Sequence, residues 1–397
     1  MRYDPSDPAV IADPYPALLA LQRDEPAHFS PRLKAWILTR HADVAAALSS
    51  NAMSVDRIRP FYAALPDTTR ASLADIVRYL SLWLVFRDPP EHTRLRSLMA
   101  TAFTMKAVAD LRPGVEELVD QLLDQCEGEV DFVERFAMRL PGLVIMDLLG
   151  VPRERMDDVK GWSDAMQLFI GSAQNTPDKY DRASAGARSM AGLFRELIED
   201  RREAPQDDLI SAFIAARDAE DRLSEDELIA ACMLVLFGGH ETTTNLLTTG
   251  LLKFIRHREV RERLAAEPAL AGKAMEECLR LDGPSGSMAR LVAQDHDLHG
   301  QRLKAGDRVF AMINAANQDP YVFDRPTEFD IARPRNRHLT FGYGPHFCIG
   351  AALARLEGEV AFLKLAQRFP GMALNGALVW HETIIMRGLR EMPVKLQ

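Results

Sequence analysis

The chain has 397 residues, a formal net charge of −9 and 26% charged residues. This acidic balance argues against nucleic acid as the main partner, because binding a duplex requires a basic face. The hydrophobic content of 47% is ordinary for a globular protein, and a chain of this length can bury a large core and enclose a cofactor.

Cysteine usage and the N-terminal residues predict the compartment. The chain has four cysteines, which are Cys126, Cys232, Cys278 and Cys348. They form no CxxC pair, and their spacing indicates neither a disulfide framework nor a zinc site. Residues 1–10 do not resemble a signal peptide, and the longest strongly apolar run, 228–239, is too short to span a bilayer. We therefore expect a cytoplasmic protein with no membrane partner.

Apolar periodicity predicts a mainly helical chain with a small β portion. In chain order we expect a strand at 35–38, helices at 115–126, 185–202 and 225–256, a turn at 301–307, a strand at 308–313 and a helix at 350–368. Ser224 and Glu227 have the spacing of a capping box, which would begin the long helix at residue 225. Residues 318–337 hold three prolines and many charges, so we expect an irregular, functional segment there. One large domain over residues 1–397 is the simplest interpretation.

The sharpest local feature is the segment 341–350, FGYGPHFCIG, which precedes a predicted helix. Glycines allow a tight turn and a close approach to a flat ligand. Backbone N–H groups after Cys348, together with the N-terminus of the helix, would stabilise negative charge on its sulfur. The alternative is a structural cysteine buried in a turn, which would be favoured for a cysteine without this surrounding pattern.

A second motif, GGHETT at 238–243, interrupts the most apolar predicted helix. Gly238 and Thr242 are four residues apart and share a face. The Thr242 hydroxyl could bond to the Gly238 carbonyl and open the helix locally, which would leave a groove for a small ligand. Glu241 is placed to deliver protons. The alternative is a helix crossing that simply needs small residues.

Two further pairs are weak signals when each is taken alone. Glu277 and Arg280 are three residues apart and could form an ordinary helix-surface ion pair. His92 and Arg96 are four residues apart on one helical face and could bind an anion, although either could also be a solvated surface residue.

The pattern FxxGxxxCxG at 341–350 closely resembles the haem-binding signature of the cytochrome P450 family, and the other motifs follow in the order that this family shows. The resemblance covers nearly the whole chain and points to the soluble bacterial type. It implies a mainly α, single-domain P450-like fold that binds heme b (iron protoporphyrin IX), with Cys348 as the ligand to iron. Gln318 departs from the pattern, because arginine is more usual there.

The resemblance also implies roles for individual residues. Glu241 and Thr242 would relay protons, and Glu277 and Arg280 would support the fold beside the haem. The other haem-binding residues implied by the resemblance are His92, Arg96, Gly238, Arg290, Phe341, His346 and Gly350. The implied substrate-pocket residues are Leu82, Trp83, Val85, Ser285, Ser287, Met288 and Ile385, with Trp83, Ser285 and Ser287 as possible polar handles.

The implied activity is insertion of one oxygen atom from O2 into a hydrophobic small molecule, by hydroxylation or epoxidation. Electrons would come from a separate ferredoxin or flavodoxin-type donor with its reductase. One alternative is a peroxide-driven peroxygenase on the same fold, although such enzymes tend to lack the acid–alcohol pair at Glu241 and Thr242. A non-enzymatic thiolate-haem sensor and a haem-free helical scaffold also fit parts of the pattern, but a scaffold would leave the cysteine loop unexplained.

Overall fold

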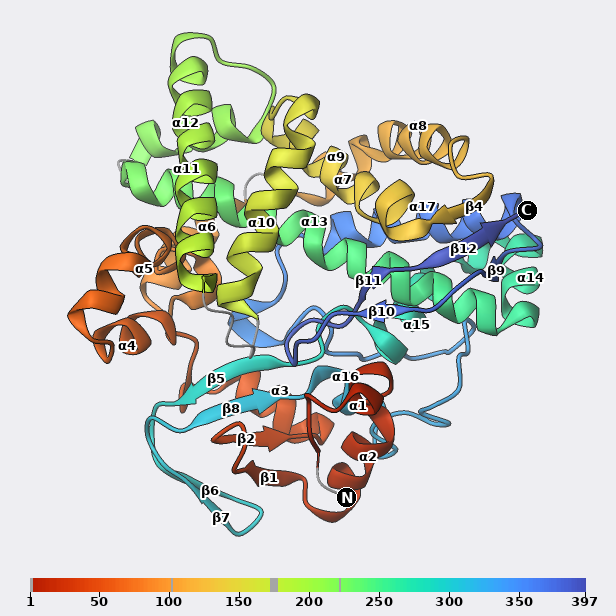
Figure 1. Ribbon diagram of the computed structural model, residues 1–397, viewed down its shortest axis with the longest axis horizontal. Coiled ribbons are helices and arrows are strands. Elements are labelled where there is room, and N and C mark those ends of the chain that lie inside the picture. The colour runs from red at the N-terminus through yellow and green to blue at the C-terminus, as the bar shows by residue number, and fades with distance from the viewer. Residues whose placement is uncertain (1–2, 101–102, 172–177, 221–222) are drawn as a thin grey trace. The chain divides into compact units, whose positions relative to one another are not determined.

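The computed structural model describes residues 3–100, 103–171, 178–220 and 223–397 (Figure 1). The chain forms two compact units. The first unit comprises Met1–Ser54, Val108–Pro141 and Glu241–Gln397, and the second comprises Val55–Ala107 and Gly142–His240. No helix in the described ranges is long and apolar enough to cross a membrane. That residues 1–397 act as one domain stays a prediction.

The first unit is a mixture of helices and strands, and it holds all the strands of the described residues. Its helical elements are α1 (Pro8–Ala12), α2 (Tyr15–Asp24), α3 (His41–Ser49), α8 (Arg112–Leu123), the π-helix η2 (Val133–Ala137), α14 (Arg258–Ala266), η4 (Pro268–Leu270), α15 (Ala271–Asp282), α16 (Ile313–Ala316), η5 (Gly344–His346) and α17 (Ala351–Arg368). Its strands are β1 (Ala27–Ser30), β2 (Ala35–Leu38), β3 (Met53–Ser54), β4 (Gly128–Asp131), β5 (Met288–Val292), β6 (His296–Leu298), β7 (Gln301–Leu303), β8 (Arg308–Ala311), β9 (Ala373–Leu374), β10 (Val379–Trp380), β11 (Leu389–Glu391) and β12 (Pro393–Leu396).

The secondary structure in the described residues of the second unit is all helical, and loops join the helices. Its elements are α4 (Ile58–Ala63), α5 (Asp67–Leu80), η1 (Leu84–Phe86), α6 (Glu91–Ala100), η3 (Arg153–Arg155), α10 (Met156–Ile170), α11 (Lys179–Glu203) and α12 (Leu209–Glu220). Three helices have residues in both units, and they are α7 (Met105–Asp110), α9 (Arg139–Leu149) and α13 (Glu225–Arg256). The predicted mainly α class with a small β portion is therefore confirmed.

The long predicted helix is confirmed as α13, and its N-terminus forms the expected capping box. The backbone N–H of Ser224 donates to Glu227 Oε2 at 2.8 Å, and the Glu227 N–H donates to Ser224 Oγ at 3.2 Å. Apolar periodicity located the predicted helices 115–126 and 185–202 but missed their polar ends. In the structure α8 begins earlier, with a proline in its first turn, and ends at Leu123, before the predicted end at residue 126, whereas α11 begins at Lys179.

The five-stranded sheet has the order β1-β2-β8-β5-β3, with β2 and β8 parallel and the other pairs antiparallel. Side chains of β2 alternate between two apolar clusters, as a strand buried on both faces requires. Trp36 and Leu38 pack in a cluster that includes residues of α3, whereas Ile37 packs in a cluster that includes residues of α2. The predicted strand at 35–38 is confirmed as β2.

The second predicted strand and its turn need correction at their edges. The strand at 308–313 ends at Ala311, because Ile313 begins the short helix α16. The predicted turn at 301–307 begins with three residues that pair antiparallel with β6 as strand β7 (Figure 1). Short strands whose residues alternate little in polarity are hard to separate from turns by periodicity alone.

The segment 318–337 is irregular, as predicted, and a buried charge cluster holds it against α15. Arg280 donates to the carbonyl oxygens of Asn317 at 2.9 Å, Pro326 at 2.6 Å and Glu328 at 3.0 Å. Carbonyl groups of a segment without regular structure need such partners when they are buried. Gln318, where arginine is more usual, donates through Nε2 to the Leu281 carbonyl at 3.0 Å and is itself buried.

The ion pair that the sequence alone suggested as an ordinary surface pair is fully buried. Arg280 makes two hydrogen bonds to Glu277, at 2.8 and 2.7 Å, and both side chains have an exposed fraction of 0%. Arg333 contributes a second guanidinium at 3.1 Å, and the backbone N–H of Asp330 donates to Glu277 Oε1 at 3.1 Å. The structural role predicted for Glu277 and Arg280 thus has a physical basis in this shared network.

A second buried carboxyl group lies in α17 and has no such support. Glu357 is 1% exposed, and its Oε2 atom has no hydrogen-bond partner among the described residues. Burial raises the pKa of Glu357 to about 8, since an unpaired carboxylate in an apolar interior is costly. The side chain is therefore a neutral acid in the folded protein at neutral pH.

We predict that replacing Arg280 by methionine lowers the free energy of unfolding by ~3–5 kcal/mol, because a buried charge network loses one partner. Chemical denaturation followed by circular dichroism measures this change. The matched control is Arg325→Met, since the Arg325 side chain is exposed and pairs with exposed Asp324 and Glu328 and, at 3.5 Å, with partly exposed Asp330, so it should contribute less than ~1 kcal/mol. Equal effects of the two substitutions would show that the network does not stabilise the fold.

We predict that Glu357 makes the protein less stable as pH rises. Its pKa is raised from 4.5 in the unfolded chain to about 8 in the folded protein. The stability that comes from holding the extra proton is full below pH 4.5 and is lost as pH rises through 8. The total change is on the order of a few kcal/mol. Glu357→Gln should abolish this decline in a denaturation series from pH 5 to 9.

The control for this series is Glu359→Gln on the same helix, because Glu359 forms a partly exposed ion pair with Arg112 at 2.9 Å. This variant should retain the pH dependence of the unmodified chain. A Glu357→Gln protein with an unchanged pH profile would mean that Glu357 is ionised in the folded state.

Candidate functional site

The cysteine loop of the first unit is turned by glycines, as its sequence predicts. Gly342 and Gly344 have φ angles of +79° and +75°, which favour glycine. The backbone N–H of Cys348 donates to the Phe341 carbonyl at 2.8 Å and closes the loop. Helix α17 begins three residues after Cys348, with Gly350 at its N-cap. The sulfur thus lies just before the positive end of a helix, where a thiolate is favoured.

Exposure separates Cys348 from the other cysteines. Cys348 is exposed, whereas Cys126, Cys232 and Cys278 are buried. Burial raises the pKa of the Cys126 thiol to about 11 and raises the pKa values of Cys232 and Cys278 further. Those three side chains remain neutral thiols inside the protein. The alternative of a buried structural cysteine therefore fits them and does not fit Cys348.

The start of the loop is fixed by the side chain of Asn317, which caps α16, and by a backbone carbonyl of α15. The backbone N–H of Leu339 donates to Asn317 Oδ1 at 2.7 Å, and Asn317 Nδ2 donates to Thr340 Oγ1 at 2.9 Å. Thr340 Oγ1 in turn donates to the Leu279 carbonyl at 2.7 Å. All of these groups are buried. The hydrogen bonds therefore hold the start of the loop in a well-defined position against α15.

Phe341, predicted to contact the cofactor, is held by a charged pair that the motif did not include. Arg355 lies over its ring at 4.5 Å from the centroid, and the His338 ring lies 5.8 Å away. Glu276 binds both of these residues, with His338 Nε2 at 3.0 Å and Arg355 Nε at 2.5 Å. Burial would raise the pKa of Glu276, but His338 and Arg355 outweigh it and lower the pKa to about 2.

Sequence reasoning missed Glu276 and Arg355 as positioning residues. The available signal was an acidic residue next to Glu277 and an arginine one and a half turns into the helix that follows Cys348. Neither signal identifies a partner, since surface helices carry many such charges. Only the packing of α15 against α17 brings these two side chains together.

The predicted cationic donors of the first unit lie on two elements. Arg290 is on β5, with an exposed fraction of 7%, and Nη1 donates to the Ala289 carbonyl at 2.9 Å. His346 is in η5, two residues before Cys348, and is partly exposed. A cationic or neutral N–H donor at each position suits a carboxylate ligand. Met288 of β5 lies near Gly342, since a Cβ added to that glycine would be 3.7 Å from Met288 Cε.

In the second unit, His92 and Arg96 share α6, as predicted. His92 is 1% exposed and Arg96 is partly exposed. Burial lowers the pKa of His92, and the positive charge of Arg96 lowers it further. His92 is therefore a neutral imidazole near neutral pH. It lies close enough to Arg96 for the positive charge of Arg96 to disfavour protonation of the imidazole.

The motif at 238–243 lies within continuous α-helix, so the predicted opening of the helix does not interrupt α13. Its two glycines differ in surroundings. A Cβ on Gly239 would lie 2.7 Å from Ile145 of α9, which is close packing, whereas a Cβ on Gly238 would meet no atom within 4 Å. Glu241 and Thr242 are partly exposed. A helix crossing that needs small residues therefore explains Gly239. It does not explain Gly238, Glu241 or Thr242.

The predicted substrate-pocket residues also lie on both units. In the second unit, Trp83 is 2% exposed and packs on Phe237 and Phe86, and its indole N–H has no partner among the described residues. Leu82 is partly exposed and Val85 is exposed. Trp83 therefore keeps an unsatisfied donor in an apolar setting, as a polar handle would.

In the first unit, the two predicted serine handles differ. Ser287 is buried and donates to the Ile384 carbonyl at 2.9 Å, so its hydroxyl hydrogen is already used within the protein. Ser285 is partly exposed and forms a β-bridge with Met386. Ile385 is partly buried, and its carbonyl accepts from the Gly286 N–H at 2.8 Å.

These residues fit a haem with a thiolate ligand. The loop presents an exposed sulfur before a helix N-terminus, and Arg290 and His346 supply donors suited to propionates. A Cβ on Gly350 would meet no atom within 4 Å although its φ of −86° does not require glycine. A flat group lying close to the backbone explains a glycine there.

Comparison with known proteins gives the same family. The cytochrome P450 family model matches residues 153–371. The chain is 35% identical to the polyketide biosynthesis cytochrome P450 PksS of Bacillus subtilis, covering 97% of this chain and 96% of that protein. It is 37% identical to vitamin D(3) 25-hydroxylase of Pseudonocardia autotrophica, covering 97% and 94%.

Comparison with solved structures gives the same family. The fold matches P450BioI in complex with an acyl carrier protein ligated to hexadec-9Z-enoic acid, with a TM-score of 0.91, 32% identity and coverage of 99% of this chain and 100% of that chain. The match includes both units and the cysteine loop region. The chain therefore belongs to the cytochrome P450 family and is a haem-containing monooxygenase, as its ordered motifs predicted.

Proposed function

We propose that this chain inserts one oxygen atom from O2 into a hydrophobic small molecule at a haem whose iron Cys348 would bind through its thiolate. The observation that carries the assignment of Cys348 is its exposure on a glycine-turned loop before α17, while the other cysteines are buried with raised pKa values. When bound, a haem with thiolate ligation supplies the oxygen-activating chemistry. The protein supplies binding, orientation and proton delivery, and we propose that both units act as one domain.

We propose that two kinds of residue hold the cofactor. Cys348 binds the iron, and Phe341, Gly350 and Gly238 shape the space beside the ring. The propionates are bound by Arg290, His346, His92 and Arg96. Arg290 supports this assignment because a guanidinium on β5 offers a planar fork of N–H donors that suits a carboxylate. The neutral imidazole of His92 can donate one N–H without adding repulsion toward Arg96.

Glu241 and Thr242 are proposed to deliver protons from solvent toward the reaction site. Both are partly exposed in the middle of α13, one turn from the open space at Gly238. A carboxylate can exchange protons with water, and a hydroxyl can both accept and donate a hydrogen bond. The pair therefore provides a path for protons that does not require either residue to move far.

The substrate class follows from the apolar residues and from the relatives. Relatives are named for vitamin D(3) and for 6-deoxyerythronolide B, and one solved relative holds a hexadec-9Z-enoic acyl group. We propose that substrate contacts come from Leu82, Trp83, Val85, Ser285, Met288 and Ile385. Ser287 is proposed to join them as an acceptor, because its hydroxyl donates to the Ile384 carbonyl and its oxygen can still accept a hydrogen bond.

The electron source distinguishes this function from the peroxygenase alternative. We propose a separate ferredoxin or flavodoxin-type donor with its reductase, acting in the cytoplasm, which cell fractionation can check. The presence of Glu241 and Thr242 favours the O2-driven route, since proton delivery is needed when oxygen is reduced by external electrons. A sensor would need neither a proton path nor a substrate pocket.

The axial ligand is tested by the spectrum of the reduced, carbon monoxide-bound protein. The unmodified chain should show the red-shifted Soret band of thiolate-ligated haem, because the thiolate pushes electron density onto the iron. Cys348→Ser should lose this band, whereas Cys126→Ala should keep it, since Cys126 is buried elsewhere in the first unit. Retention of the band in Cys348→Ser would reject Cys348 as the ligand.

The proton path is tested by coupling, measured as product formed per electron consumed with a ferredoxin and its reductase as donor. Thr242→Ala should lower coupling by up to about a hundredfold, the lower end of the range for loss of one proton-transfer group, and should release more hydrogen peroxide. Thr244→Ala is the control, because Thr244 is buried in the same helix outside the proposed path. Unchanged coupling in Thr242→Ala, or turnover with peroxide alone, would favour the peroxygenase alternative.

A further inference from the structure

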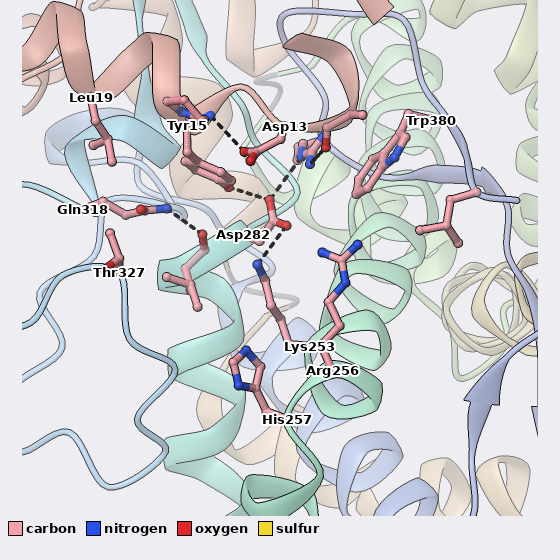
Figure 2. A pocket seen from close by; sticks show the side chains of 15 residues that line it. Asp13, Tyr15, Leu19, Lys253, Arg256, His257, Asp282, Gln318, Thr327 and Trp380 are labelled. Carbon is pink, nitrogen blue, oxygen red and sulfur yellow. Dashed lines mark hydrogen bonds and ion pairs between the residues drawn. The ribbon is translucent and has the colours of Figure 1, made fainter. Parts of the chain in front are cut away.

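A cavity of about 770 Å³ lies in the first unit, away from the cysteine loop in sequence and in lining residues (Figure 2). It is bordered by the start of α2, the C-terminal turn of α13, the end of α15 and strand β10. This volume is in the range of pockets that bind small molecules. None of the proposed haem, proton-relay or substrate residues lines it.

One wall of the cavity is a buried ionic cluster. The side chain of Asp282 is 4% exposed and accepts a hydrogen bond from Tyr15 Oη at 2.5 Å and from Arg387 Nε at 3.1 Å, with Lys253 Nζ at 3.3 Å. Burial would raise the pKa of Asp282, but Arg387 and Lys253 outweigh it and hold the pKa at about 2. Asp282 is thus a carboxylate that two cations share.

The charges that face the cavity leave an excess of positive charge. Lys253, Arg256 and Arg387 contribute three cations, and Asp13 and Asp282 contribute two carboxylates, so the balance is +1. Arg256 is exposed, and no ion pair to it occurs among the described residues. Figure 2 shows its guanidinium beside Lys253 and turned toward Trp380. His257 would add a further charge when protonated, next to Glu259 at 3.6 Å.

Next to the ionic cluster lies an aromatic wall, Trp380, that is fixed in place. Arg387 lies 3.6 Å from the centroid of the Trp380 ring, which is a close cation–π contact. Arg387 is itself anchored by the carbonyls of Ile11 at 2.6 Å and Ala12 at 2.9 Å. Leu19 and Leu378 extend the apolar surface. A rigid aromatic wall next to a cationic edge is the arrangement that orients an amphipathic ligand.

We propose that this cavity binds an amphipathic carboxylate as a second ligand, separate from the monooxygenase substrate. Arg256 and Lys253 bind the carboxylate head, and the apolar body lies against Trp380. A monoanion fits because it neutralises the excess charge, and Lys253 carries three N–H donors, of which the contact with Asp282 uses one. The proposal does not depend on the assignment of Cys348, because the two sites share no residue.

The test uses octanoate as the probe, 1-octanol as its uncharged match, and the haem-loaded full chain. Calorimetry measures binding, tryptophan emission reports Trp380, and the Soret band reports any ligand that enters the haem site. Octanoate should bind saturably and change the tryptophan emission. Arg256→Gln should weaken this binding about tenfold or more, as loss of a charge-assisted contact does, and 1-octanol should bind more weakly by a similar factor.

Two control variants locate the effect. Arg258→Gln should bind octanoate as the unmodified chain does, because Arg258 is exposed and already bonded to Glu262 at 2.6 Å. Trp380→Phe should retain calorimetric binding and lose the emission change. The proposal is overturned if octanoate does not bind, if Arg256→Gln binds it with unchanged affinity, if 1-octanol binds equally well, or if the emission change survives in Trp380→Phe.

Discussion

Glu277 places a carboxylate in the interior of the first unit, where a charge persists only if cationic and hydrogen-bond partners surround it. Arg280, Arg333 and the backbone of Asp330 supply them. The remaining donors of the two guanidinium groups bind carbonyls of the segment 318–337. A long stretch without helix or strand is thereby held in place, because the carbonyls of Asp324, Arg325, Pro326 and Glu328 each have a guanidinium donor.

The same helix then fixes the cysteine loop. Glu276, the neighbour of Glu277 in sequence, binds His338 before the loop and Arg355 after it. Both residues contact the ring of Phe341, and Thr340 bonds back to Leu279 of α15. Adjacent residues of α15 thus hold the segment 318–337 and both ends of the loop. A thiolate ligand needs this rigidity, since its distance and angle to a metal set its electronic effect.

Buried polar groups serve different purposes in different parts of the chain. The Glu277 and Asp282 clusters are held by several partners, whereas burial raises the pKa of Glu357, whose Oε2 atom has no hydrogen-bond partner among the described residues. The indole N–H of Trp83 is an unsatisfied donor beside apolar rings, which suits a residue that meets a ligand. Satisfied networks support the fold, and unsatisfied or shared donors mark places where a further group can bind.

The sequence by itself determined the family, the ligand cysteine as a candidate, the strand β2 and the long helix α13 with its capping box. These features depend on local spacing, and local hydrogen bonding and periodicity reproduce them in the structure. The sequence also found Glu277 and Arg280 but could not tell a surface pair from a buried network. Burial depends on which segments pack together, which spacing along the chain does not encode.

Only the tertiary structure decided the rest. It separated Gly239, packed on Ile145, from Gly238, which faces open space, although the two are neighbours with identical side chains. It showed that the Ser287 hydroxyl is already used by Ile384 and that Glu276 and Arg355 position the loop. It also brought Tyr15, Lys253 and Arg387 onto one carboxylate. These contacts join residues far apart in sequence, so they follow from packing and not from any local pattern.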